Sequence, residues 1–189
     1  MKLNLGCGSK IIPNYVNVDK FDLDNVDIIH DLEKTPYPFE TNSVNEIILS
    51  HVLEHLGQDF DVFNNILKEI YRICEHNALI NIRVPHPRHD FFLSDPTHVR
   101  PITSEGLTLY DQEINLKWKR DNAANTPLGL IHKINFKIEK IEYQIEPEVL
   151  TQLNSGKINN TKLEFYMKHH YNIIQETKIR WRAIKNDTT

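Results

Sequence analysis

The strongest constraint on the fold is a short apolar strand that stops in a glycine turn. Leu3 and Leu5 alternate with polar residues, Gly6-Cys7-Gly8 follows at once, and a second run, residues 15–18, ends at Asp19. Glycine removes the side chain that would otherwise keep a ligand away from the backbone. A carboxylate at the tip of the next strand is placed to accept hydrogen bonds from a ribose diol. The two strand ends therefore predict a site for an adenosine-type cofactor.

Length and composition indicate one compact domain. With 189 residues, the chain is long enough for one hydrophobic core and short for two, so we expect a single domain over 1–189. No apolar run reaches the roughly 18 residues of a membrane helix, and no signal-peptide pattern is present, which predicts a cytoplasmic protein without membrane contact. The net charge of −4 makes nucleic acid an unlikely partner. Cys7 and Cys74, the only cysteines, are expected to be reduced.

Hydrophobic periodicity predicts an α/β fold with a doubly wound, mostly parallel sheet, because short apolar runs alternate with helical patterns. The clearest helix follows the apolar stripe from Phe60 to Ile73. Residues 85–135 lack a sustained period and are interpreted as an irregular insertion on the substrate side, with a short helix near 104–110. We expect strands at 2–6, 15–18, 26–30, 45–50 and 78–84, an antiparallel edge pair at 136–145 and 177–184, and a frayed end at 186–189.

Six short motifs follow one another in an order that resembles a known family. They are Leu3-Asn4-Leu5-Gly6-Cys7-Gly8, Asn17-Val18-Asp19, Asp31-Leu32 followed by Pro36-Tyr37-Pro38-Phe39, and residues 43–48, 50–56 and 67–72. The chain resembles the class I S-adenosylmethionine-dependent methyltransferases, and within them a small type-11-like branch. The resemblance covers about residues 2–85, with weaker support at 95–100. It implies a Rossmann-like fold with a seven-stranded-type sheet, S-adenosylmethionine as cofactor, and an enzyme that transfers a methyl group.

The resemblance also implies roles for individual residues. The turn at Gly6 to Gly8 would hold the methionine part of the cofactor, and Asp19 would bind the ribose hydroxyls. Asp31 would accept a hydrogen bond from the adenine amine while Leu32 packs against the ring, although a turn cap is an alternative for Asp31. The full set of cofactor-binding candidates is Asn4, Gly6, Cys7, Gly8, Ser9, Asp19, Asp31, Leu32, Ser50 and His51.

Two positions depart from the pattern of the family. Asp19 follows Gly8 by only eleven positions, with Pro13 between them, which leaves room for one helical turn at most. We therefore expect a shortened first helix and a more exposed cofactor. Glu75-His76-Asn77 stands where the family commonly has a proline-glycine turn, and Asn77 is able to adopt the left-handed conformation needed there.

The segment His51-Val52-Leu53-Glu54-His55 also matches a motif of another class of enzyme. His-x-x-Glu-His is the pattern of inverted zinc peptidases, in which both histidines lie on one helix face. A zinc hydrolase using His51, Glu54 and His55 is therefore a remote alternative. The apolar run 47–49 leads directly into the motif, which favours a strand end over a helix. At the carboxyl end of that strand, His51 would face the crevice where such sheets bind ligands.

A further group of histidines and charged residues follows the fifth strand, over residues 85–100, and we expect this segment to frame the acceptor site. Imidazole exchanges protons near neutral pH, so the candidate catalytic residues are His51, His86 and His98, among which the sequence does not select. Four competent metal ligands also occur here, but their irregular spacing predicts no particular geometry, and we expect no metal. These four are His86, His89, Asp95 and His98.

The resemblance leaves two functions open. The first is methyl transfer by in-line displacement to an oxygen or nitrogen of a small molecule or glycan. Enzymes that methylate base amines commonly resemble one another through an Asn/Asp-Pro-Pro-aromatic strand end, and Ser50-His51 stands there instead, which disfavours a nucleic-acid substrate. The second is a protein that binds S-adenosylmethionine or S-adenosylhomocysteine without catalysis, which the sparse N-terminal cover favours. The residues fix neither the acceptor nor the oligomeric state.

Overall fold

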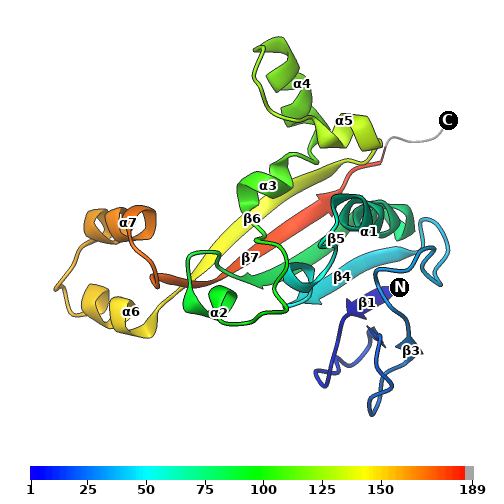
Figure 1. Cartoon of the computed structure of the whole chain (residues 1–189), viewed down its shortest axis with the longest axis horizontal. Coiled ribbons are helices and arrows are strands. Elements are labelled where there is room, and N and C mark those ends of the chain that lie inside the picture. Colours follow the sequence, from blue (N-terminus) through cyan, green and yellow to red (C-terminus); the bar gives the residue numbers. More distant parts are fainter. Residues whose placement is uncertain (186–189) are drawn as a thin grey trace.

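The computed structural model describes residues 1–185, which form one seven-stranded sheet (Figure 1). The expected end at 186–189 lies outside the described residues. The order across the sheet is β3-β2-β1-β4-β5-β7-β6; neighbours among the first five strands are parallel, and β7 is antiparallel to β5 and β6. This confirms the mostly parallel α/β sheet with an antiparallel edge. The strands are β1 (Lys2–Leu5), β2 (Val16–Asp19), β3 (Ile28–Ile29), β4 (Val44–Ser50), β5 (Cys74–Pro85), β6 (Phe136–Ile145) and β7 (Ile174–Ala183).

Loops alone connect the first four strands. Within the described residues no helix lies between β1 and β4, so turns replace even the shortened first helix that the sequence predicts. Asn4 Nδ2 donates to the carbonyl oxygen of Lys10 (2.8 Å) and to Asn17 Oδ1 (2.9 Å). Asn17 Oδ1 also accepts from the amide of Ile12 at 2.9 Å. Two buried amide side chains thus fix the segment that a longer helix would occupy.

Helix α1 (Phe60–Ile73) follows the bounds that its apolar stripe predicts. The Asp59 carboxylate caps its first turn by accepting from the amides of Asp61 (2.8 Å) and Val62 (3.2 Å). A short 3-10 helix, η1 (Leu53–His55), precedes it. The buried side of α1 belongs to the same hydrophobic core as β1, β4 and β5, so this helix covers the centre of the sheet.

The insertion after β5 folds into short helices: α2 (Asp90–Leu93), α3 (Ser104–Thr108), α4 (Gln112–Arg120) and α5 (Leu128–His132). The helix expected near 104–110 corresponds to α3, whose first turn is capped by the Thr103 hydroxyl accepting from the amide of Gly106 (3.0 Å). Helix α4 projects away from the strands in Figure 1 and buries only Asn115. Such a helix shows no apolar stripe, which explains why periodicity did not locate it.

A long antiparallel hairpin completes the sheet. Strands β6 and β7 pair from Phe136 opposite Ala183 to Ile145 opposite Ile174, which confirms the predicted edge pair. Between them lie α6 (Pro147–Asn154) and α7 (Asn160–His169), at the far end of the hairpin in Figure 1. Neither helix contains a buried residue, so the sequence offered no core-facing pattern for them. None of the helices in residues 1–185 is both long enough and apolar enough to span a membrane.

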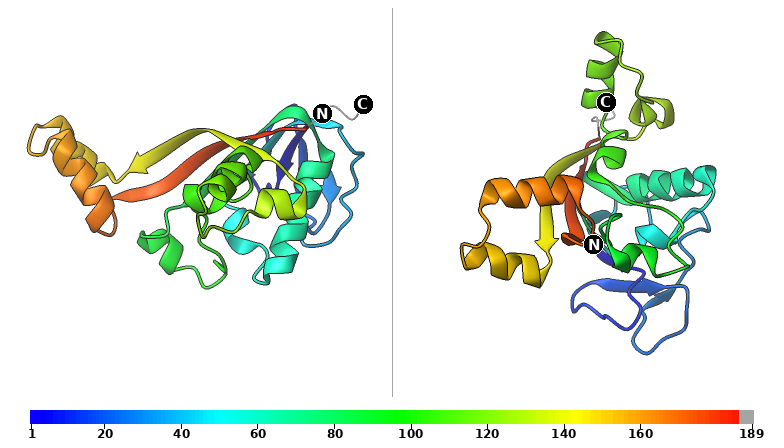
Figure 2. Two further views of the ribbon diagram at one scale, coloured as in Figure 1. Left: turned by 90° about the horizontal axis from the view of Figure 1, so that it is seen from above. Right: turned by 60° about the vertical axis from the view of Figure 1, so that its left-hand side comes forward.

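The two faces of the sheet differ in what covers them. Figure 2 shows α1 to α5 on one side of the strands, and among the described residues no helical layer lies on the other, which we call the open face. The strand order is therefore that of a doubly wound sheet, but among the described residues helices cover only one of its faces. Neighbouring strands align polar side chains on the open face, and such a surface is stable in water without a cover. One aligned row holds Asn4, Asn81 and Arg180, with the half-buried Ile48 between Asn4 and Asn81, and the next row is Ser50, Arg83 and Lys178.

Candidate functional site

A cavity of about 580 Å³ lies at the carboxyl ends of β1 to β4, and we call it the strand-end cavity. Its size lies within the roughly 300–1,000 Å³ of small-molecule and cofactor sites. The carboxyl ends of parallel strands are also where open α/β sheets bind ligands. Several of the predicted cofactor residues line it, namely Gly6, Gly8, Asp19, Asp31, Leu32 and His51.

The glycine turn forms one wall of this cavity. Gly6 and Gly8 have φ angles of +67° and +51°, in the left-handed region that is costly for other residues. A Cβ on Gly6 would lie 2.6 Å from Val52 Cγ2, whereas a Cβ on Gly8 would meet nothing within 4 Å. Gly6 therefore lets the turn pack against the segment after β4, and Gly8 leaves bare backbone at the cavity.

Asp19 holds the glycine turn and lines the cavity at the same time. One carboxylate oxygen accepts from the amide of Gly8 (2.8 Å) and the other from the amide of Phe21 (3.0 Å). Each oxygen keeps a further lone pair with which it can accept from a ligand hydroxyl. The sequence predicted the position of Asp19 at the end of β2 but not its bond to Gly8.

Asp31 and Leu32 follow β3 on the opposite wall. Asp31 Oδ1 accepts from the amide of Glu33 (3.1 Å), so the turn-capping role that the sequence offered as an alternative is present. The Leu32 side chain is buried, and its carbonyl oxygen accepts from the hydroxyl of Tyr37 (2.8 Å). Burial raises the pKa of Tyr37 well above its usual range, which keeps this hydroxyl a donor.

Four predicted cofactor contacts are absent from the lining of the strand-end cavity. Asn4 is used in the amide network of the first loop, and Ser9 is exposed. The Cys7 side chain is buried, and burial raises the pKa of its thiol. Ser50 lines a smaller hollow on the open face instead. Their contact with a cofactor stays a prediction.

Sequence reasoning missed several residues of the lining. Phe21 and Leu23 stand at the cavity with 60% and 40% of their surface exposed, and His30 lies nearby. Exposed apolar side chains beside a cavity are typical of ligand sites. The only signal in the sequence was their position directly after Asp19, in a loop without periodicity.

His51 lines the strand-end cavity and also contacts strand β7. It is the first residue after β4 and has a φ of +57°, which is uncommon outside glycine and often found at functional sites. Its Nε2 lies 3.1 Å from Glu176 Oε1 on β7, and its Nδ1 lies 3.4 Å from Glu54 Oε1. Arg83 Nε and Nη2 both lie 2.5 Å from the other oxygen of Glu176. Both ring nitrogens of His51 therefore face carboxylates.

A second cavity, also about 580 Å³, lies between the end of β5, α3, β6 and α7, and we call it the insertion cavity. His86 lines it, so two of the three candidate histidines stand in different cavities. His86 Nδ1 accepts from the amide of Arg88 (3.2 Å). Burial, followed by the nearby Arg88, lowers the pKa of His86, which favours a neutral ring at pH 7. The same wall carries Tyr143, Glu105 and Lys168.

The His-x-x-Glu-His motif does not form the helix that a zinc peptidase needs. Strand β4 ends at Ser50, directly before His51, and only the short η1 helix follows. His51 faces Glu176, whereas His55 Nδ1 lies 2.9 Å from the hydroxyl oxygen of Thr97. The geometry thus gives no support to the zinc hydrolase alternative, because the pattern requires both histidines on one helix face.

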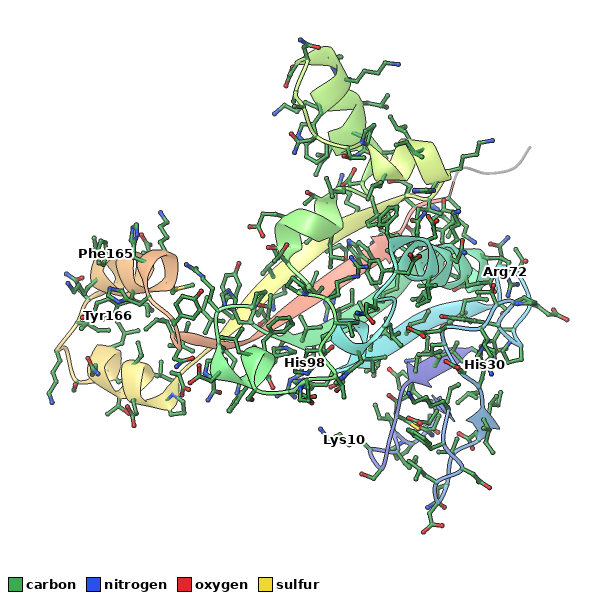
Figure 3. All side chains as sticks on the ribbon, viewed as in Figure 1. Lys10, His30, Arg72, His98, Phe165 and Tyr166 are labelled. Carbon is green, nitrogen blue, oxygen red and sulfur yellow. The ribbon has the colours of Figure 1, made fainter. Side chains whose placement is uncertain are left out.

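The four metal ligands considered after β5 do not form a cluster. His89 is buried, with its Nε2 2.9 Å from Glu146 Oε1, and His86 lines the insertion cavity. His98 instead lies near α2, as Figure 3 shows. The centroid of its ring is 4.6 Å from that of His55. Within residues 1–185, a single group of three side chains is spaced to hold a metal ion, namely Glu54, His55 and His98.

Comparisons of the sequence with protein-family models and with curated proteins give no match. Comparison of the structure gives clear neighbours. An S-adenosylmethionine-dependent methyltransferase from Archaeoglobus fulgidus superposes with a TM-score of 0.58 over 96% of this chain and 85% of that chain, at 18% identity. The 1,6-didemethyltoxoflavin-N1-methyltransferase of Burkholderia thailandensis, with bound 1,6-didemethyltoxoflavin and S-adenosylhomocysteine, superposes with a TM-score of 0.53 over 97% and 71%, at 10% identity. The cyclase SpnF gives a TM-score of 0.52 over 98% and 75%, at 13% identity.

These similarities define the fold of the chain. It has the Rossmann-like fold of the class I S-adenosylmethionine-dependent methyltransferases, with the antiparallel β7 between β5 and β6. The resemblance seen in the sequence motifs is thereby confirmed at the level of the fold. One neighbour is a cyclase, so the fold alone does not fix the reaction.

Proposed function

We propose that the chain is a methyltransferase that binds S-adenosylmethionine in the strand-end cavity. The observation that carries this proposal is the convergence of Gly8, Asp19 and Asp31 on one cavity from the ends of three neighbouring strands. Gly8 leaves room for a ligand against the backbone. Asp19 suits the hydroxyls of a ribose, and Asp31 suits an exocyclic amine, because carboxylates are acceptors.

The residues around the cavity suit a reaction in which the protein acts mainly by aligning the acceptor with the methyl group of the cofactor. The bound cofactor supplies an electrophilic methyl group on a sulfonium. The chain then has to align an acceptor with that group and exclude water, and alignment contributes up to about 7–11 kcal/mol in ideal intramolecular reactions. His51 is the candidate histidine that lines this cavity. Its two nitrogens face Glu176 and Glu54, so we assign it the positioning of the reactants rather than the removal of a proton.

We propose a small molecule or glycan with an oxygen or nitrogen nucleophile as the acceptor. The insertion cavity mixes charges of both signs, with Arg88 and Lys168 near Glu105 and Glu164. Mixed charges suit a polar acceptor of low net charge better than a polyanionic nucleic acid, which needs a basic surface. The Burkholderia neighbour, whose named substrate is a small molecule, supports the same class.

Calorimetric titration with S-adenosylhomocysteine tests the cofactor site. We expect the Asp19→Ala variant to bind at least about 10-fold more weakly, because hydrogen bonds to a charged group contribute about 1.5–3 kcal/mol. Asp27→Ala is the matched control, since Asp27 accepts from Asn17, on the same strand as Asp19, but does not line the cavity. Unchanged affinity in a folded Asp19→Ala variant refutes the ribose assignment.

A second candidate is a protein that binds the cofactor or its product without catalysis. It is favoured by the loop connection between β1 and β2, which leaves the cavity with little cover. A methyl-release assay on pools of metabolites and sugars separates the two. Tight binding of S-adenosylhomocysteine with no turnover on any pool favours this candidate.

A further inference from the structure

Glu54 is a buried carboxylate without donors. Its side chain is 0% exposed, and neither of its oxygens has a hydrogen-bond partner among the described residues. The nearest cationic candidate, His51 Nδ1, lies 3.4 Å from Oε1 but outside hydrogen-bond geometry. Burying an ionised carboxylate is costly unless a positive charge or donors compensate it. Glu54 is therefore a fully buried carboxyl group whose oxygens have no hydrogen-bonded partner among the described residues, which points to a ligand at this position.

Two neighbouring histidines each have one ring nitrogen without a hydrogen bond among the described residues, and the first is His55. In His98 this nitrogen is Nε2, which lies 3.8 Å from Asp95 Oδ2. The Thr97 hydroxyl donates to Asp95 Oδ1 (2.6 Å), which leaves its oxygen to accept from His55 Nδ1 (2.9 Å). His55 Nδ1 thus carries the proton, and the lone pair of the neutral ring is on Nε2.

The second is His98, where the backbone fixes the tautomer. Its Nδ1 lies 2.8 Å from the carbonyl oxygen of Phe92, which can only accept, so Nδ1 carries the proton. The Phe92 ring stacks on the imidazole at 5.3 Å and 17° between ring planes, which holds its orientation. Histidines that bind a metal through one ring nitrogen usually donate the N–H of the other nitrogen to an acceptor of this kind, which fixes the ring orientation.

We infer that Glu54, His55 and His98 bind a divalent transition-metal ion of the Zn²⁺ class. One ligand atom from each residue lies within 4.8 Å of those of the other two. Tetrahedral Zn²⁺ needs about 3.4 Å between ligand atoms, from bonds of about 2.1 Å, so a modest inward movement completes the set. Two imidazoles and one carboxylate favour Zn²⁺, Fe²⁺ or Co²⁺ over Mg²⁺, which prefers oxygen ligands.

The ion would adjoin the strand-end cavity, because His55 and Thr97 line it. Three protein ligands leave at least one coordination position for a water or a ligand oxygen. This site differs from the zinc-peptidase pattern, since His51 is not a ligand and His98 comes from a segment more than 40 positions away. The backbone joins the two segments through the amide of Val99, which donates to the carbonyl oxygen of Glu54 (2.9 Å).

Titration of the metal-stripped full chain with ZnCl₂ by calorimetry tests the inference, with MgCl₂ as comparison. We expect one Zn²⁺ per chain, and a loss of affinity of about 100-fold or more in Glu54→Gln and in His98→Ala. Glu46→Gln on the open face and His169→Ala on α7 are the matched controls, and both should bind as the parent does. Circular dichroism and thermal unfolding of each variant establish that it is folded.

Two outcomes overturn the inference: no Zn²⁺ binding to the folded parent chain, or binding that Glu54→Gln and His98→Ala leave unchanged. The first would leave His51, 3.4 Å away, as the partner of Glu54. The test does not depend on the proposed function, because S-adenosylhomocysteine binding is measured separately. Asp19→Ala is expected to weaken only the nucleoside, and Glu54→Gln only the ion.

Discussion

The helix-covered face and the open face of the sheet come from the same strands but carry opposite kinds of side chain. On β7, Ile179 and Trp181 point toward the helices and are buried, whereas Lys178 and Arg180 between and beside them are exposed. Parallel strands usually read as continuous apolar runs, because helices cover both of their faces. In the parallel strand β4 burial alternates as well, with Ile47 and Leu49 buried and Ile48 between them only half-buried. One layer of helices is therefore enough for this sheet.

The same difference shapes the candidate site. Loops, rather than helices, connect β1 to β4, and the strand-end cavity lies among those loops. The open face reaches the site through Glu176, which binds Arg83 and contacts His51. The covered face supplies Val52, against which the glycine turn packs. The site thus lies between the hydrophobic core of the covered face and the loops that connect β1 to β4.

The largest expected effect lies on the covered face. Trp181 is fully buried and stacks on Phe136, with ring centroids 4.5 Å apart. Trp181→Ala is expected to lower the free energy of unfolding by about 3–5 kcal/mol, because it opens a large cavity in the core. Urea denaturation followed by circular dichroism measures this loss. Arg180→Ala, its neighbour on the open face, should stay within about 0.5 kcal/mol of the parent; equal losses in both variants contradict the assignment of the faces.

A smaller effect is expected where the core meets the glycine turn. Gly6→Ala places a Cβ 2.6 Å from Val52 and strains a φ of +67°, so we expect a loss of stability of about 1–3 kcal/mol and weaker binding of S-adenosylhomocysteine. Thermal unfolding and calorimetry measure the two quantities. Gly156→Ala has a similar φ of +74° but nothing within 4 Å, and therefore isolates the backbone strain. If both variants lose equal stability, the contact with Val52 has no energetic role.

The smallest effect belongs to an ion pair on the open face. Lys2 Nζ lies 2.8 Å from Glu46 Oε2, and this bond is the main cause that lowers the pKa of Glu46. The pKa of Glu46 is lower in the folded state than in the unfolded chain. The pair therefore stabilises the folded protein at pH values above the ordinary pKa of glutamate, and this contribution is lost as the pH falls through the lowered pKa. Glu46→Gln should cost less than about 1 kcal/mol at pH 7, since Lys2 is half exposed.

Urea denaturation of the parent and Glu46→Gln between pH 7 and about pH 3, below the ordinary pKa of glutamate, measures this pH dependence. The difference between the two proteins should shrink toward zero at the acidic end, and added salt should reduce it at pH 7. A difference that persists in acid would instead indicate lost packing at position 46.

Elements with a core-facing pattern were predictable from the sequence, and the others were not. The stripe of α1 and the alternation of β6 and β7 agree with the structure because burial imposes those periods. Helices α6 and α7 bury no residue, so no comparable pattern marks them. The left-handed conformation expected for Asn77 is present, with a φ of +67°. Capping and turn chemistry act locally, which is why that expectation needed no knowledge of the fold.

What the sequence by itself determined is the set of strand ends at the cavity: the glycine turn and Asp19 are local features that fix where backbone and carboxylate stand. Only the tertiary structure decided which histidines meet. The sequence did not distinguish the candidate catalytic residues His51, His86 and His98, yet each has different neighbours in the structure. His98 lies beside Glu54 and His55, although it comes from a distant segment. The physical reason is that the hydrogen-bond partners of a histidine ring are its neighbours in space. For His51, His55 and His98 those neighbours come from β7 and from the insertion after β5, far along the chain from His51 and His55.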